Sequence, residues 1–268
     1  MNVFRREFSF QLRYTLIWTI VLLLWALMFI PVTGQIMEEM DTIIQFFDKF
    51  PKALLRTFNM DAEMFSKPEG VFGSEGMSFA YILGGIFASL LAGRVFAREY
   101  EEKTIEYLLV KPLSRRSLFV QKALCMVLFL LFSGVLFGGS IQLLFRAFIG
   151  PKYAFSTTVL LGFALYEIVV MLFFGAISAL VSVIAQSTTL NTAISMALVI
   201  FMYFGSTLVD LNPALGWMRY ASIFPYIPLI DTVKNEQVFW ANSLWIAALS
   251  GVILLVALRV FEKKEIRI

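Results

Sequence analysis

Charged side chains that could bind another protein are concentrated in one short stretch, Arg94–Lys122. It holds seven Lys or Arg and four Glu residues, although only 15% of the whole chain is charged. In a helix, its apolar residues would share one face and its charged residues would line another. These are Ile105, Leu108 and Leu109 on the apolar side, and Glu99, Lys103 and Glu106 on the charged side. Such a helix, joined to membrane spans, is suited to transmitting force from a soluble partner.

The same stretch carries its own boundary residues. Pro112 stops the first helix, and Ser114 can cap a second one that starts at Arg115 and Arg116. The second helix runs on into an apolar segment, so the amphipathic helix would be joined rigidly to the membrane. A plainer interpretation is also open, because Lys and Arg clusters beside a span commonly anchor it at the membrane surface among anionic lipids.

Many other chemistries are excluded by composition. The chain has no histidine and one cysteine, Cys125, which rules out His-based catalysis, an internal disulfide and a thiolate metal cluster. No phosphate-binding glycine loop is present. We therefore expect a non-catalytic chain that binds no metal, no cofactor and, with a net charge of only +3, no nucleic acid.

The elements that position the charged stretch are membrane spans. Of the 268 residues, 59% are hydrophobic, far above what a soluble surface allows. Six stretches have the length that a spanning helix needs, which predicts an all-α integral membrane protein, a single transmembrane domain over residues 1–268. The predicted spans are residues 16–32, 77–96, 123–145, 159–185, 192–209 and 239–260.

The distribution of Lys and Arg predicts that both termini are cytoplasmic. With that orientation, 14 of the 22 positive residues lie inside the cell, and the four positives of the first outer segment are offset by eight acids. Residues 1–14 would form an amphipathic elbow helix, residues 34–75 an extracellular cap with short helices, and residues 261–268 a cytoplasmic tail. For residues 210–238, short outer helices and a re-entrant turn both fit. The short uncharged loop at residues 186–191 predicts a tight hairpin between spans four and five.

The order of residue types after the second span resembles a known signature. It reads E-x-E-x-x-T-x-x-x-L-L-x-x-P-x-x-R, with a Lys seven positions later. In this chain it is formed by Glu99, Glu101, Thr104, Leu108, Leu109, Pro112, Arg115 and Lys122. Together with six spans and inward termini, it resembles the coupling-helix region of type-2 ABC exporter permeases. Members of that family commonly have Gly before the Thr; Lys103 stands there, and we expect the chain to stay helical at that point.

The resemblance implies a mechanism and partners. Such permeases pair as homo- or heterodimers, and each coupling helix docks in a separate ABC ATPase subunit that holds the ATP and Mg²⁺. By this resemblance, residues 99–116 form the ATPase-coupling region. Ile105, Leu108 and Leu109 would enter the ATPase groove, and Glu99, Glu101, Glu106, Arg115 and Arg116 would pair at its rim. The external cap is similar to that of small Gram-positive permeases that export antimicrobial or amphipathic peptides.

Two further features lie inside the predicted spans. Glu167 is the one acid deep in a hydrocarbon stretch; it could form a cation, proton or substrate site, or it could reach water or pair with Arg146 or Lys152 near the outer end. Small residues at helical spacing, Gly85, Ser89 and Gly93 in one span and Gly134 and Gly138 in another, predict close helix packing within the subunit or at a dimer seam.

The predicted function is thus the membrane subunit of an ATP-driven exporter of a lipophilic or amphipathic substrate, with peptides favoured. The alternative is an ion-gradient-driven secondary transporter or channel that needs no ATPase. That alternative calls for midplane polar residues in several spans, and Glu167 is a single one.

Overall fold

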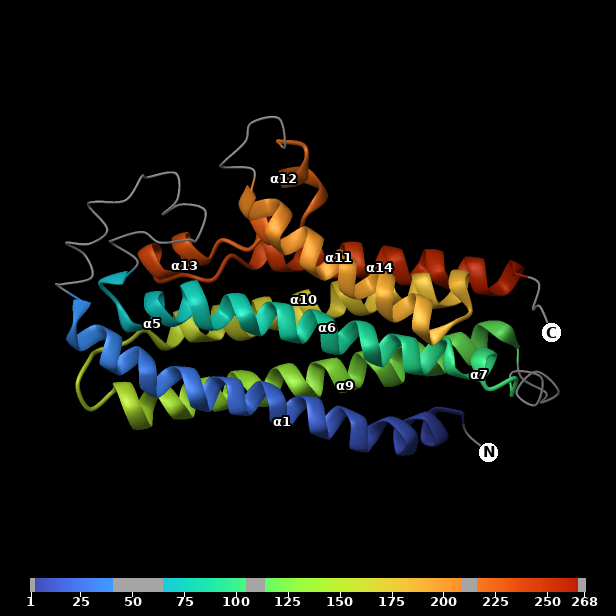
Figure 1. Cartoon of the computed structure of the whole chain (residues 1–268), viewed down its shortest axis with the longest axis horizontal. Helices are drawn as coiled ribbons and strands as arrows, with labels where there is room; N and C mark the ends of the chain where they lie inside the picture. The colour runs from blue at the N-terminus through green and yellow to red at the C-terminus, as the bar shows by residue number, and fades with distance from the viewer. Residues whose placement is uncertain (1–2, 41–64, 105–113, 209–215, 265–268) are drawn as a thin grey trace.

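The computed structural model describes residues 3–40, 65–104, 114–208 and 216–264. In this part of the chain, six helices are long and apolar enough to cross a membrane. They lie roughly side by side in one bundle (Figure 1). They are α1 (Val3–Glu38), α6 (Met77–Phe96), α9 (Arg115–Leu144), α10 (Thr157–Ala185), α11 (Thr188–Leu208) and α14 (Trp240–Lys263). Within the described residues, all six predicted spans are confirmed as helical; residue 209, the last of the fifth predicted span, lies outside them.

The core of the bundle is built around α10 and α6, the two most buried spanning helices. The most extensive helix–helix interface in the described part of the chain is between these two, and α10 also packs against α14, α9 and α11. Their buried residues are almost all apolar, with aromatic rings such as Tyr81, Phe163 and Phe174 fully enclosed. By contrast α1, α11 and α14 leave most of their apolar surface outside the bundle, as expected of helices that face lipid.

The predicted rows of small residues pack within the chain. Gly85 faces Phe174 and Val199, and Gly93 faces Asn191, so one row seats α6 against α10 and α11. Between them, the backbone oxygen of Ser89 accepts hydrogen bonds from Ser178 and Asn191.

The second row of small residues is on α9, where Gly134 faces Ile168 and Gly138 faces Ala164. A Cβ atom added to Gly138 would lie only 2.6 Å from the Cβ of Ala164. Both partners are on α10. The faces that carry the two rows are therefore occupied by the subunit's own helices, and they are not available as a dimer seam.

The N-terminal segment differs from the prediction. Residues 3–14 do not form a separate elbow helix; they continue straight into the first span as part of the 36-residue α1. The physical reason is a buried polar row, Glu7, Gln11, Thr15 and Thr19, that keeps the same face of α1 against the bundle as the apolar residues Leu22, Ala26 and Ile30. One continuous face favours one continuous helix.

Short helices lie at the end of the bundle where α1 ends and α6 begins. They are α5 (Pro68–Val71) and η1 (Phe72–Gly76), which lead into α6, and α13 (Leu229–Asn235). Lys67 ties two of these segments together through an ion pair with Glu236 at 2.5 Å and a hydrogen bond to the Val233 carbonyl.

Of the predicted segment 210–238, the described part forms short helices: α12 (Met218–Ala221), η4 (Phe224–Tyr226) and α13. This favours the short-helix interpretation over a re-entrant turn. Residues 41–64 of the predicted cap and residues 209–215 lie outside the described residues.

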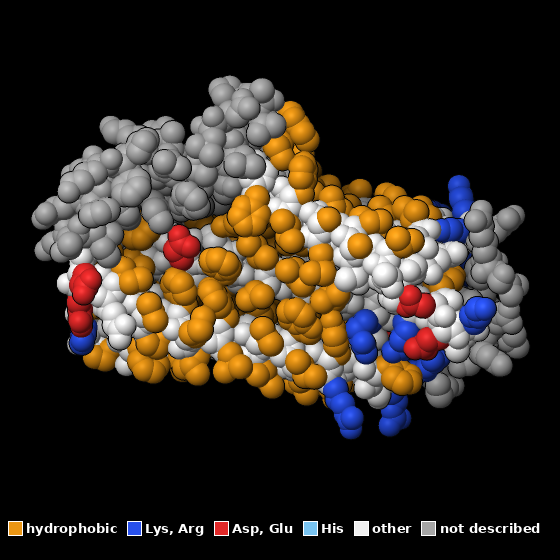
Figure 2. All heavy atoms as spheres, in the orientation of Figure 1, with side chains coloured by type: hydrophobic (Ala, Val, Ile, Leu, Met, Phe, Trp, Pro, Cys, Tyr) orange, Lys and Arg blue, Asp and Glu red, His pale blue; other side chains and the backbone are white. Residues whose placement is uncertain are grey.

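The other end of the bundle gathers the charged residues. The N- and C-termini and the short helix α7 (Arg98–Glu101) are all at this end (Figure 1), and Figure 2 shows Lys and Arg side chains collected there. The predicted hairpin is present as well, since only Gln186 and Ser187 separate α10 from α11. We call this the basic end.

Two neighbouring glycines of α9 provide a matched test of the packing. Gly138→Ala places its methyl group against Ala164, which is part of a helix and cannot rotate away, so we expect a loss of about 1–3 kcal/mol of stability. Gly139→Ala meets nothing within 4 Å and should be neutral or slightly stabilising. Thermal unfolding of the detergent-purified variants measures both. Equal melting temperatures for the two variants would contradict the α9–α10 contact.

Candidate coupling site at the basic end

A buried lysine organises the basic end. Lys122 of α9 is only 3% exposed, and its ammonium contacts two carboxylates, Glu7 of α1 at 3.0 Å and Glu99 of α7 at 2.7 Å. It also donates a hydrogen bond to the Val95 carbonyl in the last turn of α6, at 2.6 Å. One cation thus joins three helices and the terminus of a fourth. We call Glu7, Lys122 and Glu99 the triad.

The electrostatics of the triad are strong because water is excluded from it. Glu7 and Glu99 are as buried as the lysine. Burial opposes the charged form of Glu99, but the Lys122 ammonium overrides this effect and lowers the pKa of Glu99 below the usual glutamate range. A lowered pKa means that Glu99 stabilises the fold above the ordinary glutamate pKa, and that this stabilisation is lost as the pH falls through the lowered value.

Two more cations close the ends of neighbouring helices. Arg115, in the first turn of α9, donates hydrogen bonds to the carbonyls of Glu262 and Lys264 at the end of α14. Lys264 in turn donates to the carbonyls of Val183 and Ile184 at the end of α10. The last carbonyls of a helix have no partner within the helix and carry partial negative charge. Lys122 of α9 bonds the end of α6 in the same way. The ends of α6, α10 and α14 are therefore each capped by a cation from another element.

The segment after α6 turns sharply at Lys103, which corrects the expectation of a continuous helix. Lys103 has a positive φ of 55°, the Thr104 N–H bonds to the Glu99 carbonyl at 2.9 Å, and the Lys103 N–H bonds to the Tyr100 carbonyl at 3.2 Å. These two bonds form a Schellman motif, which places one residue in the left-handed conformation. The family's usual glycine fits that conformation without strain, and here a lysine adopts it.

The other side chains of α7 bind it to the bundle. Arg98 stacks over the ring of Phe10 on α1 at 4.8 Å and pairs with Glu102 at 3.9 Å. Glu101 accepts hydrogen bonds from Thr188 and Thr189, which open α11. Helix α7 is therefore connected to α1, α9 and α11 by separate interactions.

Apart from Thr104, whose N–H closes the turn at Lys103, the predicted coupling residues fall into three groups. Ile105, Glu106, Leu108, Leu109 and Pro112 lie outside the described residues. Arg116 and Glu101 are exposed at the basic end, as an interface requires. Glu99 and Arg115 point into the bundle, because each meets a partner there, so we no longer place them at the rim of a partner's groove.

The predicted cap of α9 is confirmed, since Ser114 accepts a hydrogen bond from the Ser117 N–H at 3.1 Å. Sequence reasoning missed Glu7. Its signal was present, because Glu7, Gln11, Thr15 and Thr19 recur every four residues along α1. In the structure this row turns inward: Gln11 accepts a hydrogen bond from Arg94, and Thr19 bonds Ser133.

Glu167 lies apart from the basic end, at the interface of α10 and α6. Its carboxyl is fully buried opposite Gly84, whose missing side chain makes the space that it occupies. Neither oxygen has a hydrogen-bond partner among the described residues, and Lys152 pairs instead with Glu38. In the described residues, Glu167 therefore pairs with neither Arg146 nor Lys152, and its side chain is not exposed at the surface.

These features together define a class of protein: a polytopic α-helical membrane protein in which Thr104 and Ser114, on either side of residues 105–113, belong to segments anchored to the bundle. Comparison with known families identifies it further. The family model for "ABC-2 family transporter protein" matches residues 1–266, so the chain belongs to the ABC-2 transporter family, the membrane permeases of type-2 ABC exporters. No curated protein matches the chain.

The triad can be tested by removing its cation. Lys122→Met leaves Glu7 and Glu99 buried without an opposite charge, and we expect a loss of about 3–5 kcal/mol of stability. Adding Glu7→Gln and Glu99→Gln removes the uncompensated charges and should restore most of the loss. Denaturation of the purified proteins measures both. A triple variant no more stable than Lys122→Met would show that the ion pairs do not hold this end together.

The turn at Lys103 gives a second test. Lys103→Gly relieves the left-handed strain and should raise stability by about 1 kcal/mol. The matched control is Glu102→Gly, because Glu102 has an ordinary helical φ of −77° and glycine there only adds freedom to the unfolded chain. Melting temperatures that move in opposite directions are expected; a decrease for Lys103→Gly would refute the turn.

Proposed function

We propose that this chain is the membrane subunit of an ATP-driven exporter, and that residues 105–113 dock in a separate ABC ATPase. In this proposal the basic end faces the cytoplasm, both termini are cytoplasmic, and ATP and Mg²⁺ are bound by the partner. Two ATPase subunits and a second permease, identical or paralogous, would complete the transporter. The family and the excess of Lys and Arg at this end support the arrangement.

The observation that carries the proposal is how the docking segment is anchored. It begins after Thr104, where α7 is held by the triad, by Phe10 and by Thr188 and Thr189. It ends at Ser114, beside Arg115, which holds the end of α14. A force on the segment therefore acts on α1, α6, α9, α11 and α14 together, as a lever between an ATPase and a membrane bundle requires.

The substrate we propose is lipophilic or amphipathic, with peptides favoured. The support is the family's export chemistry and the chain's own composition, because 28 Phe and 12 Met residues provide large, adaptable apolar surfaces in the membrane. A substrate that enters from the bilayer would meet such surfaces first.

The docking segment can be tested with an ATPase co-expressed from a neighbouring reading frame. Leu109→Glu would bury an unpaired charge in the ATPase groove, so we expect binding at least about 30-fold weaker and loss of stimulated ATP hydrolysis. Arg116→Glu should slow association by reversing an exposed charge at the rim. Arg116 is preferable to Arg115, because Arg115 also holds α14.

The matched control is Arg13→Glu, which reverses an exposed charge on α1 at the same end. Co-purification and ATPase rate should be as in the unchanged protein for this control. If Leu109→Glu binds the ATPase like the control, the segment is not the docking element. If the purified permease alone moves substrate without any ATPase, the exporter-subunit proposal itself is wrong.

A further inference from the structure

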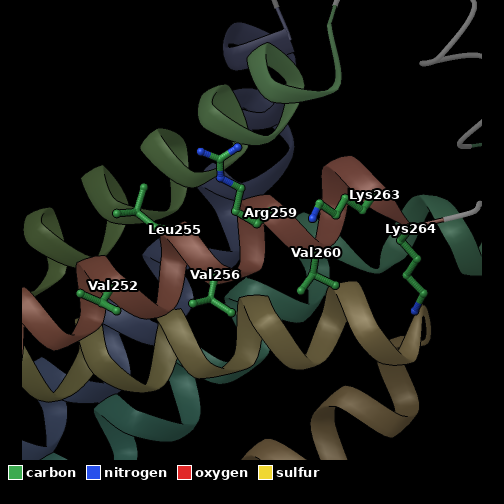
Figure 3. Close-up of a pocket in the computed structure, with 7 residues that line it drawn as sticks. All are labelled: Val252, Leu255, Val256, Arg259, Val260, Lys263 and Lys264. Atoms are coloured by element: carbon green, nitrogen blue, oxygen red, sulfur yellow. The ribbon is translucent and has the colours of Figure 1, made fainter.

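The last turns of α14 form a surface groove of 580 Å³ whose lining changes from apolar to basic along the helix (Figure 3). The apolar part consists of Val252, Leu255 and Val256, and the part at the basic end carries Arg259 and Lys263. We propose that this groove binds one anionic phospholipid, with an acyl chain along the apolar part and the phosphate between Arg259 and Lys263.

The dimensions of the groove fit a lipid in one leaflet. Val252, Val256, Arg259 and Lys263 recur at helical spacing, so they share one side of α14. The rise from Val252 to Lys263 is about 16 Å at 1.5 Å per residue. Half of the roughly 30 Å hydrocarbon core of a bilayer is about the same length. An acyl chain whose headgroup lies at Lys263 would therefore end beside Val252, near the bilayer midplane.

The two cations are available to a phosphate group. The Arg259 side chain is 77% exposed, and it pairs with Glu262 of the same helix at 3.6 Å, a surface ion pair that contributes little. Lys263 is exposed as well. Lys264 is committed elsewhere, since its ammonium donates to the end of α10. Figure 3 shows Lys264 directed away from Arg259 and Lys263.

A second copy of the chain is the competing occupant, and the charges oppose it. In a two-fold symmetric dimer the same patch lies on both sides of the contact, so Arg259 and Lys263 of one copy would approach those of the other. Like charges across an interface cost several kcal/mol, and the centres of protein interfaces are poor in charged residues. A phospholipid supplies both the hydrocarbon and the negative charge that the groove lacks.

Native mass spectrometry of the purified permease tests the proposal, with phosphatidylglycerol and phosphatidylcholine as probes. We expect the unchanged protein to retain phosphatidylglycerol in preference to phosphatidylcholine. Arg259→Gln with Lys263→Gln should weaken phosphatidylglycerol binding on the order of 30-fold, because each cation at a membrane surface contributes roughly fivefold. Leu255→Trp, which fills the groove and keeps every cation, should reduce occupancy too.

The control removes the same charge from the same end of the molecule. Arg5→Gln with Arg13→Gln alters two exposed cations of α1, which lies across the bundle from α14 (Figure 1), and should leave the preference for phosphatidylglycerol unchanged. An equal loss in this control would mean that the attraction is diffuse, and the site would be refuted. The proposal would also be overturned if the unchanged protein binds no phosphatidylglycerol and Leu255→Trp converts a dimer to a monomer. That result would assign the groove to a second copy of the chain. The measurement needs no ATPase, so it is independent of the coupling test.

Discussion

The burial of one ammonium group constrains the whole basic end. Lys122 is removed from water, and a buried charge of this kind is tolerable only when opposite charges and hydrogen-bond acceptors surround it. Its acceptors come from α1, α6 and α7, so these three elements and α9 must meet at one point. None of them can withdraw without leaving a charge or a helix terminus unpaired. The position of α7, and with it the start of the docking segment, follows from this constraint.

The capping cations extend the same constraint to the rest of the bundle. Arg115 of α9 holds the end of α14, and Lys264 at the end of α14 holds the end of α10. Lys122 holds the end of α6. The ends of three spans are therefore linked through α9, the helix that follows the docking segment. Closely packed interiors transmit displacement and do not absorb it, and the Gly-lined contacts of α6 and α9 with α10 are packed in this way.

Hydropathy was sufficient to predict the six spans and their approximate ends, because a spanning helix must be long and apolar whatever its neighbours are. It was not sufficient for the side chains that face one another. Glu99 reads as a surface charge of an amphipathic helix, and only the tertiary contact with Lys122 and Glu7 turns it inward. The turn at Lys103 was missed for a related reason: lysine has no intrinsic preference for the left-handed conformation, and the hydrogen bonds of the helix end impose it. The pairing of Glu167 with the space at Gly84 likewise depends on how α6 and α10 cross.

All Lys and Arg residues of one end count equally toward the orientation in the membrane. In the structure, however, they are of two kinds. Lys122, Arg115 and Lys264 are directed at carboxylates and helix ends, where they hold the bundle together. Arg116, Arg259 and Lys263 are exposed, and exposed cations beside a span are accessible to what lies outside the subunit. Two exposed surfaces are thereby separated by position: Arg116 stands at the end of the docking segment, and Arg259 and Lys263 stand at the end of an apolar groove on α14. In the two proposals above, the Lys and Arg residues that orient the chain in the membrane also provide the contacts for two different neighbours, a soluble ATPase and a lipid.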